Sequence, residues 1–131
     1  QKWISAIKSL IDTNNIENIE IDYNSSYVSP GNFLRFNDIL SKYKIDLNDD
    51  YLSNFSLLLD LYKKEKNYNI IELILYLTEV YFYNASQKKG INLERLVDDK
   101  SFVITNLDKF LLYNINQKVL INAISNKFSN G

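Results

Sequence analysis

The sequence predicts an all-α protein, a helical bundle preceded by a smaller helical segment. Three observations predict this fold class. Apolar residues recur at a spacing of three or four along most of the chain, as on one face of a helix. Hydrophobic residues make up 46% of the 131 residues, which is enough to build a core. Only three glycines and one proline are present, so breaks between helices are few.

The first part of the chain reads as a helix followed by an ambiguous segment. Trp3, Ile7 and Ile11 share one helical face and predict a helix over about residues 2–12. Between residues 16 and 23 the apolar side chains fit either a strand or a helix. Because a lone strand in a helical chain has no partner, we expect a short helix there.

Ser29, Pro30 and Gly31 open the next predicted helix. Serine is a preferred N-cap, because its hydroxyl accepts a bond from a free backbone N–H of the first turn. Proline fits the first helical position, where its missing N–H costs nothing. We expect Gly31 to leave room for a close neighbour. The buried side of this helix is expected to carry Phe33, Leu34, Phe36, Ile39, Leu40 and Tyr43.

Four helices are expected after residue 43, and the first two follow each other closely in the sequence. Asn48 or Asp49 is expected to cap the first of them, which carries an apolar stripe. The second spans residues 69–88 and is apolar nearly all round, so we expect it at the centre of the bundle. Gly90 is its predicted C-cap, with Lys88 and Lys89 in its last turn. The stripe of the first helix consists of Leu52, Phe55, Leu58, Leu59 and Tyr62.

The last two helices are separated by a short break. Residues 92–100 are expected to be a polar connection, with room for one helical turn around Leu93 and Leu96, after which Ser101 or Thr105 starts a helix. That helix ends at Asn114, and Asn116 caps the closing helix. The side chains expected to face inward from the closing helix are Val119, Leu120, Ala123, Ile124 and Phe128.

The composition excludes several kinds of chemistry. With no cysteine and no histidine, the chain has no thiol or imidazole mechanism and no zinc site of the usual kind. The net charge is −1, and the lysines at 63, 64, 66, 88 and 89 lie near helix ends, where they complement the helix dipole rather than mark a nucleic-acid surface. No apolar run reaches the ~20 residues that span a bilayer.

Paired carboxylates are the remaining candidates for chemistry. The pairs at 49–50 and 98–99 are expected to precede helices and to cap them. Glu72 and Glu79 lie two turns apart on one helical face, but the carboxylate metal sites of helical bundles also need histidine. The sequence therefore predicts no catalytic residue, no metal site and no cofactor.

A first stretch of the chain is similar to a known family. The run Ser29, Pro30, Gly31 and the residues up to Leu34 resemble the pattern that starts the last lid helix in the delta-prime subunit of the bacterial DNA polymerase III clamp loader. Active relatives place a sensor arginine where Gly31 stands. The resemblance therefore implies a lid that does not read a nucleotide phosphate.

A second stretch supports the same resemblance. Residues 114–122, with Asn114, Asn116 and Leu120 at the matching positions, are similar to the pattern that opens the final helix of the family's collar domain. The order and separation of the helices between the two stretches also fit that family.

The resemblance implies an organisation and a role. Residues 1–43 would form a helical lid, and residues 44–131 a collar that packs against other subunits of the loader, delta and gamma or tau. The nucleotide-binding core lies outside this sequence, so we expect a part of a larger, cytoplasmic protein that acts in DNA replication without catalysis. We expect no direct contact with nucleic acid or with membrane.

Two other classes of function stay open. One is an unrelated all-helical adaptor domain from an AT-rich genome or a virus, and the other is a binder of single-stranded nucleic acid through exposed tyrosines. The residues that contact partners are unknown from the sequence. Candidate aromatic anchors are Tyr62, Tyr76 and Tyr113.

Overall fold

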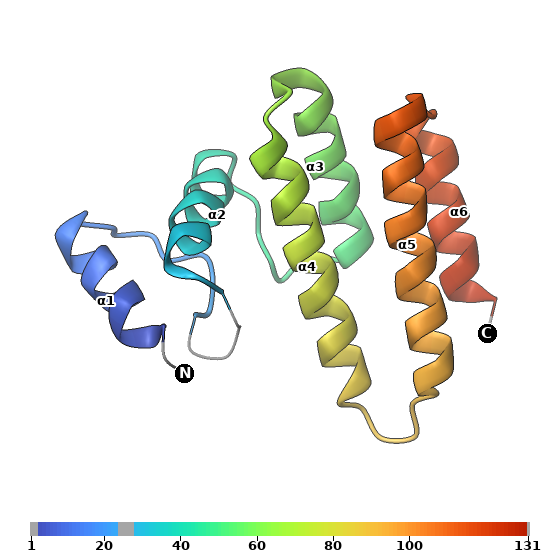
Figure 1. Cartoon of the computed structure of the whole chain (residues 1–131), viewed down its shortest axis with the longest axis horizontal. Coiled ribbons are helices and arrows are strands. Elements are labelled where there is room, and N and C mark those ends of the chain that lie inside the picture. Colours follow the sequence, from blue (N-terminus) through green and yellow to red (C-terminus); the bar gives the residue numbers. More distant parts are fainter. Residues whose placement is uncertain (1–2, 24–27, 131) are drawn as a thin grey trace.

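A computed structural model describes residues 3–23 and 28–130, and within these ranges the chain is all-helical, without strands (Figure 1). The predicted fold class is confirmed. The two N-terminal helices lie at one side of the molecule and the C-terminal helix at the other. The helices are α1 (Ile4–Thr13), α2 (Pro30–Lys42), α3 (Tyr51–Glu65), α4 (Tyr68–Ser86), α5 (Leu93–Tyr113) and α6 (Gln117–Ser129).

Helices α3 to α6 form a four-helix bundle. They run alternately up and down, and each contacts two others, so that α3 packs on α4, α4 on α5, α5 on α6 and α6 on α3 (Figure 1). Short connections between antiparallel neighbours favour this arrangement. The buried apolar residues of the bundle are Phe55, Leu58, Leu59, Ile70, Ile71, Leu73, Ile74, Phe82, Val103, Leu107, Phe110, Leu120 and Ile124.

Helices α1 and α2 pack on each other, and α2 packs on α4. The rings of Phe36 in α2 and Tyr76 in α4 lie 5.4 Å apart at this contact. Ile7 and Phe33 are fully buried and belong to the same apolar cluster as the bundle core. The predicted division into residues 1–43 and 44–131 falls at the link between α2 and α3 and stays a prediction.

The short helix predicted within residues 16–23 is wrong. This segment has no regular secondary structure. The buried side chain of Asn37 in α2 serves it as a partner instead. Its Oδ1 accepts a hydrogen bond from the Glu20 backbone N–H at 2.7 Å, and its Nδ2 donates to the Asn18 carbonyl at 2.8 Å. This irregular segment is thus held by an amide side chain rather than by a neighbouring strand.

The polar connection predicted over residues 92–100 is also wrong, because α5 already starts at Leu93. Asn92 caps it, accepting a hydrogen bond from the Arg95 backbone N–H at 3.2 Å. Inside this helix the buried carboxylate of Asp99 lies 3.5 Å from the Lys127 ammonium of α6. Residues that the sequence pattern alone assigns to a connection thus lie inside α5, and Asp99 among them is paired with a residue of α6.

Three smaller predictions need correction. Helix α4 ends at Ser86, so Gly90 is not its C-cap and instead has a φ of 73° in the following turn. Lys88 and Lys89 consequently lie beyond the helix. Val119 does not face inward, since it is 59% exposed, whereas the neighbouring Leu120 is 2% exposed and turns toward the core.

Candidate functional site

The start of α2 has the cap that the sequence predicts. The Ser29 hydroxyl accepts a hydrogen bond from the Asn32 backbone N–H at 3.3 Å, and Pro30 occupies the first helical position. The Ser29 carbonyl accepts the first helical bond from the Phe33 N–H at 2.8 Å. This cap aims the buried ring of Phe33 into the apolar cluster.

Gly31 is exposed, and the close neighbour expected there is absent among the described residues. A Cβ at this position would meet only the Arg35 guanidinium, at an ordinary contact distance of 3.7 Å. Arg35 in turn lies 3.8 Å from the Glu72 carboxylate of α4 and also bonds to Asn32. The space beside Gly31 is thus occupied by an ion pair between α2 and α4, not by packed backbone.

The second stretch forms the turn between α5 and α6. Asn114 adopts the left-handed conformation with a φ of 53°, which ends α5. Asn116 caps α6 as predicted, since its side chain accepts bonds from the N–H groups of Lys118 and Val119. Leu120 is 2% exposed and enters the bundle core. The following Gln117 adds a tie to α3, because its Nε2 donates to the Ser56 carbonyl at 3.1 Å.

The two stretches are not brought together. Within the described residues α2 contacts α1 and α4, whereas the turn at Asn114 to Asn116 joins α5 to α6. Ser29, Pro30 and Gly31 therefore form no common site with Asn114, Asn116 and Leu120. Each stretch starts its own helix.

The three candidate tyrosine anchors differ in exposure. Tyr113 is 72% exposed at the end of α5. Tyr62 is half-buried with the Lys66 ammonium 5.8 Å from its ring centre. Tyr76 is half-buried against Phe36. Only Tyr113 presents most of its surface to a partner.

Tyr51 and Tyr81 belong to an aromatic cluster that joins α3, α4 and α6. The rings of Tyr51 and Tyr81 stack with centroids 4.3 Å apart, and Phe128 of α6 lies 5.9 Å from Tyr81. Thr78 donates its hydroxyl hydrogen to the Ile74 carbonyl, so the Tyr51 hydroxyl is the donor in its 2.7 Å bond to Thr78. Burial raises the pKa of Tyr51 far above its ordinary value, and burial also raises the pKa of Tyr81.

The carboxylates singled out from the sequence lie beside basic partners or at a cap. Asp50 caps α3, accepting a bond from the Ser53 N–H at 3.1 Å, so the cap predicted at Asn48 or Asp49 is wrong. The pair at 98–99 lies inside α5 and does not cap it. Both of its carboxylates contact Lys127, and the hydrogen bond that the Lys127 ammonium donates to Asp98 raises the pKa of that ammonium.

Glu72 and Glu79 form no metal site with other carboxylates. Glu72 pairs with Arg35, and Glu79 accepts a bond from the Lys100 ammonium at 2.7 Å. Across residues 3–23 and 28–130, no group of three acidic, cysteine or histidine side chains is placed to hold a metal ion. In the same ranges no helix is long and apolar enough to cross a membrane.

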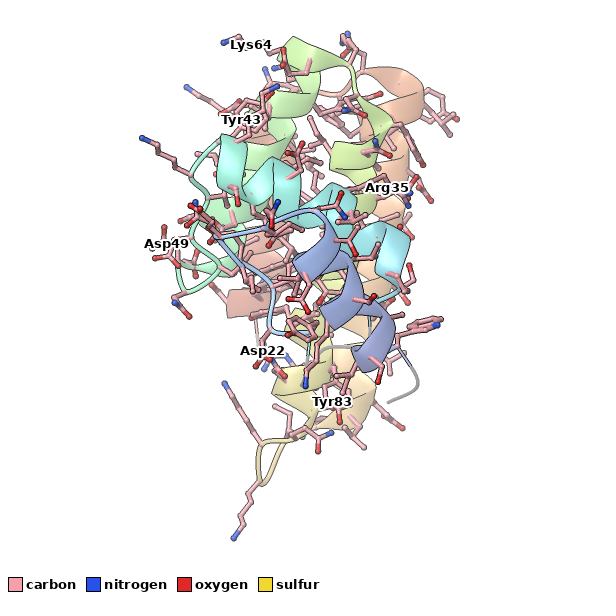
Figure 2. The ribbon with its side chains drawn as sticks, turned by 90° about the vertical axis from the view of Figure 1, so that its left-hand side faces the viewer. Asp22, Arg35, Tyr43, Asp49, Lys64 and Tyr83 are labelled. Atoms are coloured by element: carbon pink, nitrogen blue, oxygen red, sulfur yellow. The ribbon has the colours of Figure 1, made fainter. Side chains whose placement is uncertain are left out.

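A surface with several exposed apolar side chains lies where the α4–α5 hairpin extends past α3 and α6, at the bottom of Figure 1. We call it the hairpin-end surface. Its groove of about 250 Å³ is bordered by Tyr83, Leu93 and Val97, which are 62%, 58% and 66% exposed. Figure 2 shows Tyr83 near the lower end of the molecule. Large apolar side chains gathered around one groove are typical of a protein interface.

The sequence pattern does not predict this surface. It places Leu93 and Val97 in a polar connection, because the polar residues from Asp98 to Lys100 interrupt the helical period. An exposed apolar residue also looks the same in sequence as a buried one. The helical spacing of Leu93, Leu96 and Val97, at positions i, i+3 and i+4, is the signal that could have placed them on one helical face.

Comparison of the chain with models of protein families, with curated proteins and with solved structures found no match.

Proposed function

We propose that the chain is a non-catalytic assembly module, the lid and collar region of a clamp-loader subunit similar to delta-prime. In this role it acts in DNA replication by binding neighbouring subunits. The observation that carries the proposal is the hairpin-end surface, a groove bordered by exposed apolar side chains of α4 and α5.

Two further features support this function. The helix that starts at Ser29 and Pro30 is followed by a four-helix bundle whose last turn is built on Asn114 and Asn116, in the order that the family resemblance implies. Gly31 presents no side chain at the exposed start of α2. A lid of this kind supplies no charged group of its own at position 31 for a nucleotide phosphate.

The test is complex formation with clamp-loader subunits. The chain is mixed with delta and with gamma or tau from one bacterium whose delta-prime subunit carries the same two sequence stretches, and the mixture is run on gel filtration. We expect the chain to co-elute with them. A specific interface of ordinary size buries ~1,600 Å² in total, and a complex held by such an interface stays together on the column. Repeated failure to co-elute with full-length partners would count against the proposal.

A double variant locates the contact. Leu93→Ser with Val97→Ser removes two apolar side chains of the hairpin-end surface and should weaken the complex by about tenfold or more. The matched control is Leu112→Ser, which changes a 74% exposed leucine at the opposite end of α5. Equal weakening by both changes would remove the hairpin-end surface from the proposal.

A second candidate is an all-helical adaptor domain unrelated to clamp loaders. The observation that favours it is the shared apolar cluster, in which Ile7 and Phe33 join the bundle core. An adaptor would bind partners through the hairpin-end surface but would not co-elute with loader subunits. The same gel-filtration experiment therefore separates the two candidates.

A further inference from the structure

A groove of about 630 Å³ opens between the N-terminal region and the bundle. One wall is the irregular segment 19–22, the other wall is the link 46–49 between α2 and α3, and α4 contributes an apolar floor that includes Leu77. Asp22 and Asp49, one from each wall, point to the same side of the molecule in Figure 2. We call this feature the acidic groove.

Carboxylates line both walls of the acidic groove. Glu20 and Asp22 come from the first wall, and Asp46 and Asp49 come from the second. In the part of the chain that the structure describes, no lysine or arginine lines the groove. The whole chain has a net charge of only −1, so this negative charge is a local concentration. A cleft lined by one sign of charge attracts ligands of the opposite sign.

The walls are held in place before any partner binds. Asn37, 4% exposed, bonds to the backbone of Asn18 and Glu20 in the first wall. Asn54, 7% exposed, donates to the Asp46 carbonyl in the second wall at 3.0 Å. Because these amides hold the backbone of both walls, the walls do not have to be ordered on binding, which lowers the entropic cost of association.

The groove also offers apolar contact. Ile19 is 46% exposed at its rim, and Leu77 and Val80 line its floor. A ligand that uses the whole groove therefore carries both positive charge and apolar side chains. Nucleic acid does not fit, because its phosphates would face the carboxylates of both walls.

We propose that the acidic groove binds a segment of a partner protein in which lysine or arginine alternates with apolar residues. The basic side chains pair with Glu20 and Asp49 on opposite walls, while the apolar side chains contact Ile19 and the α4 floor. The acidic groove shares no lining residue with the hairpin-end groove, so this proposal does not rest on the clamp-loader function.

The test measures peptide binding to the full 131-residue chain by fluorescence anisotropy. The probe is a fluorescein-labelled peptide in which lysine alternates with leucine. A peptide with serine in place of leucine reports the apolar contribution, and one with glutamate in place of lysine reports the charge. We expect the lysine–leucine peptide to bind most tightly and to lose affinity as salt is raised.

Matched double variants locate the binding. Glu20→Gln with Asp49→Asn keeps the side-chain shapes and the backbone bonds and removes one carboxylate from each wall. The control, Glu17→Gln with Asp108→Asn, changes the net charge equally at positions that do not line the acidic groove. The groove variant should weaken binding about tenfold and the control less than about twofold. Circular dichroism spectra confirm that both variants stay folded.

Three results would overturn the proposal. The first is no binding of the lysine–leucine peptide at low salt. The second is equal weakening by the two double variants, which would mean attraction to overall charge alone. The third is self-association of the chain that the groove variant abolishes, as seen by sedimentation velocity, which would make the lysines of a second copy the occupant.

Discussion

The two regions of the molecule bury apolar side chains in different ways. In the bundle, helices α3 to α6 cover one another's apolar faces (Figure 1). Backbone N–H and C=O groups in the interior of an α-helix bond within that helix. In the N-terminal region, residues 16–23, which follow α1, have no regular secondary structure and nevertheless bury Ile21 at 1% exposure. The backbone of that segment needs bonding partners from elsewhere, and Asn37 supplies two of them.

This difference shows where single side chains matter most. A bundle core distributes its stabilisation over many similar contacts, so one lost contact leaves the architecture intact. An irregular segment depends on a few specific hydrogen bonds, because each unmade bond leaves a part-buried polar group without a partner. The following changes test whether the two regions also unfold separately.

The largest effect is expected from truncating equally buried phenylalanines in the two regions. Phe55→Ala in α3 should lower the free energy of unfolding by about 3–5 kcal/mol, measured by urea unfolding, because it leaves a cavity in the bundle core. Phe33→Ala in α2 should instead raise hydrogen exchange in α1 and α2 while α3 to α6 keep their protection. Faster exchange in all six helices after Phe33→Ala would show one cooperative unit and remove the division near residue 43.

The next effect is expected at Asn37. Asn37→Ala removes both bonds to the irregular segment and should cost about 2 kcal/mol in the free energy of unfolding, since the Glu20 N–H and the Asn18 C=O lose a partner in a part-buried place. Asn126→Ala, on the exposed face of α6, is the control and should cost less than about 0.5 kcal/mol. An Asn37 variant as stable as its control would contradict the role given to this side chain.

The helix caps provide a smaller and more even comparison. Asn116→Ala in the bundle and Ser29→Ala in the N-terminal region each remove a side-chain acceptor at a helix start, and each should cost about 1 kcal/mol in thermal or urea unfolding. If the regions unfold separately, only Asn116→Ala should lower the midpoint of the bundle transition. A midpoint lowered equally by both variants would argue for a single transition.

The smallest effect concerns alkaline pH. Burial raises the pKa of Tyr51 above the ordinary value of 10.0, so the folded chain keeps this proton where the unfolded chain has lost it. The associated stability is present in full below pH 10.0 and is lost as the pH rises toward the pKa of the folded state. The raised pKa values of Tyr81 and Lys127 act in the same direction.

Tyr51→Phe should therefore flatten, but not abolish, the loss of stability above pH 10.0 in urea unfolding. Tyr113→Phe is the matched control, because Tyr113 is 72% exposed. It should leave the alkaline slope unchanged. A Tyr51 variant with the slope of the unmodified chain would assign the pH dependence to other groups.

Much of the fold was determined by the sequence alone. The helical period of the apolar residues predicts α1, α2, α3, α4 and α6 to within a few residues, because each helix must turn one apolar face toward the core. The caps at Ser29 and Asn116 were also predictable, since a polar side chain and the N–H groups it bonds are near neighbours in sequence.

The tertiary structure alone decided the features that join distant residues. Asn37 holds a segment seventeen to nineteen positions before it, and Lys127 pairs with Asp99 from another helix. The two proposed binding surfaces are of the same kind, because Leu93 becomes exposed where the hairpin extends past its neighbours, and Glu20 and Asp49 line one groove only once the chain is folded. Periodicity reports which way a side chain points on its own helix. What lies opposite that side chain depends on how the helices pack.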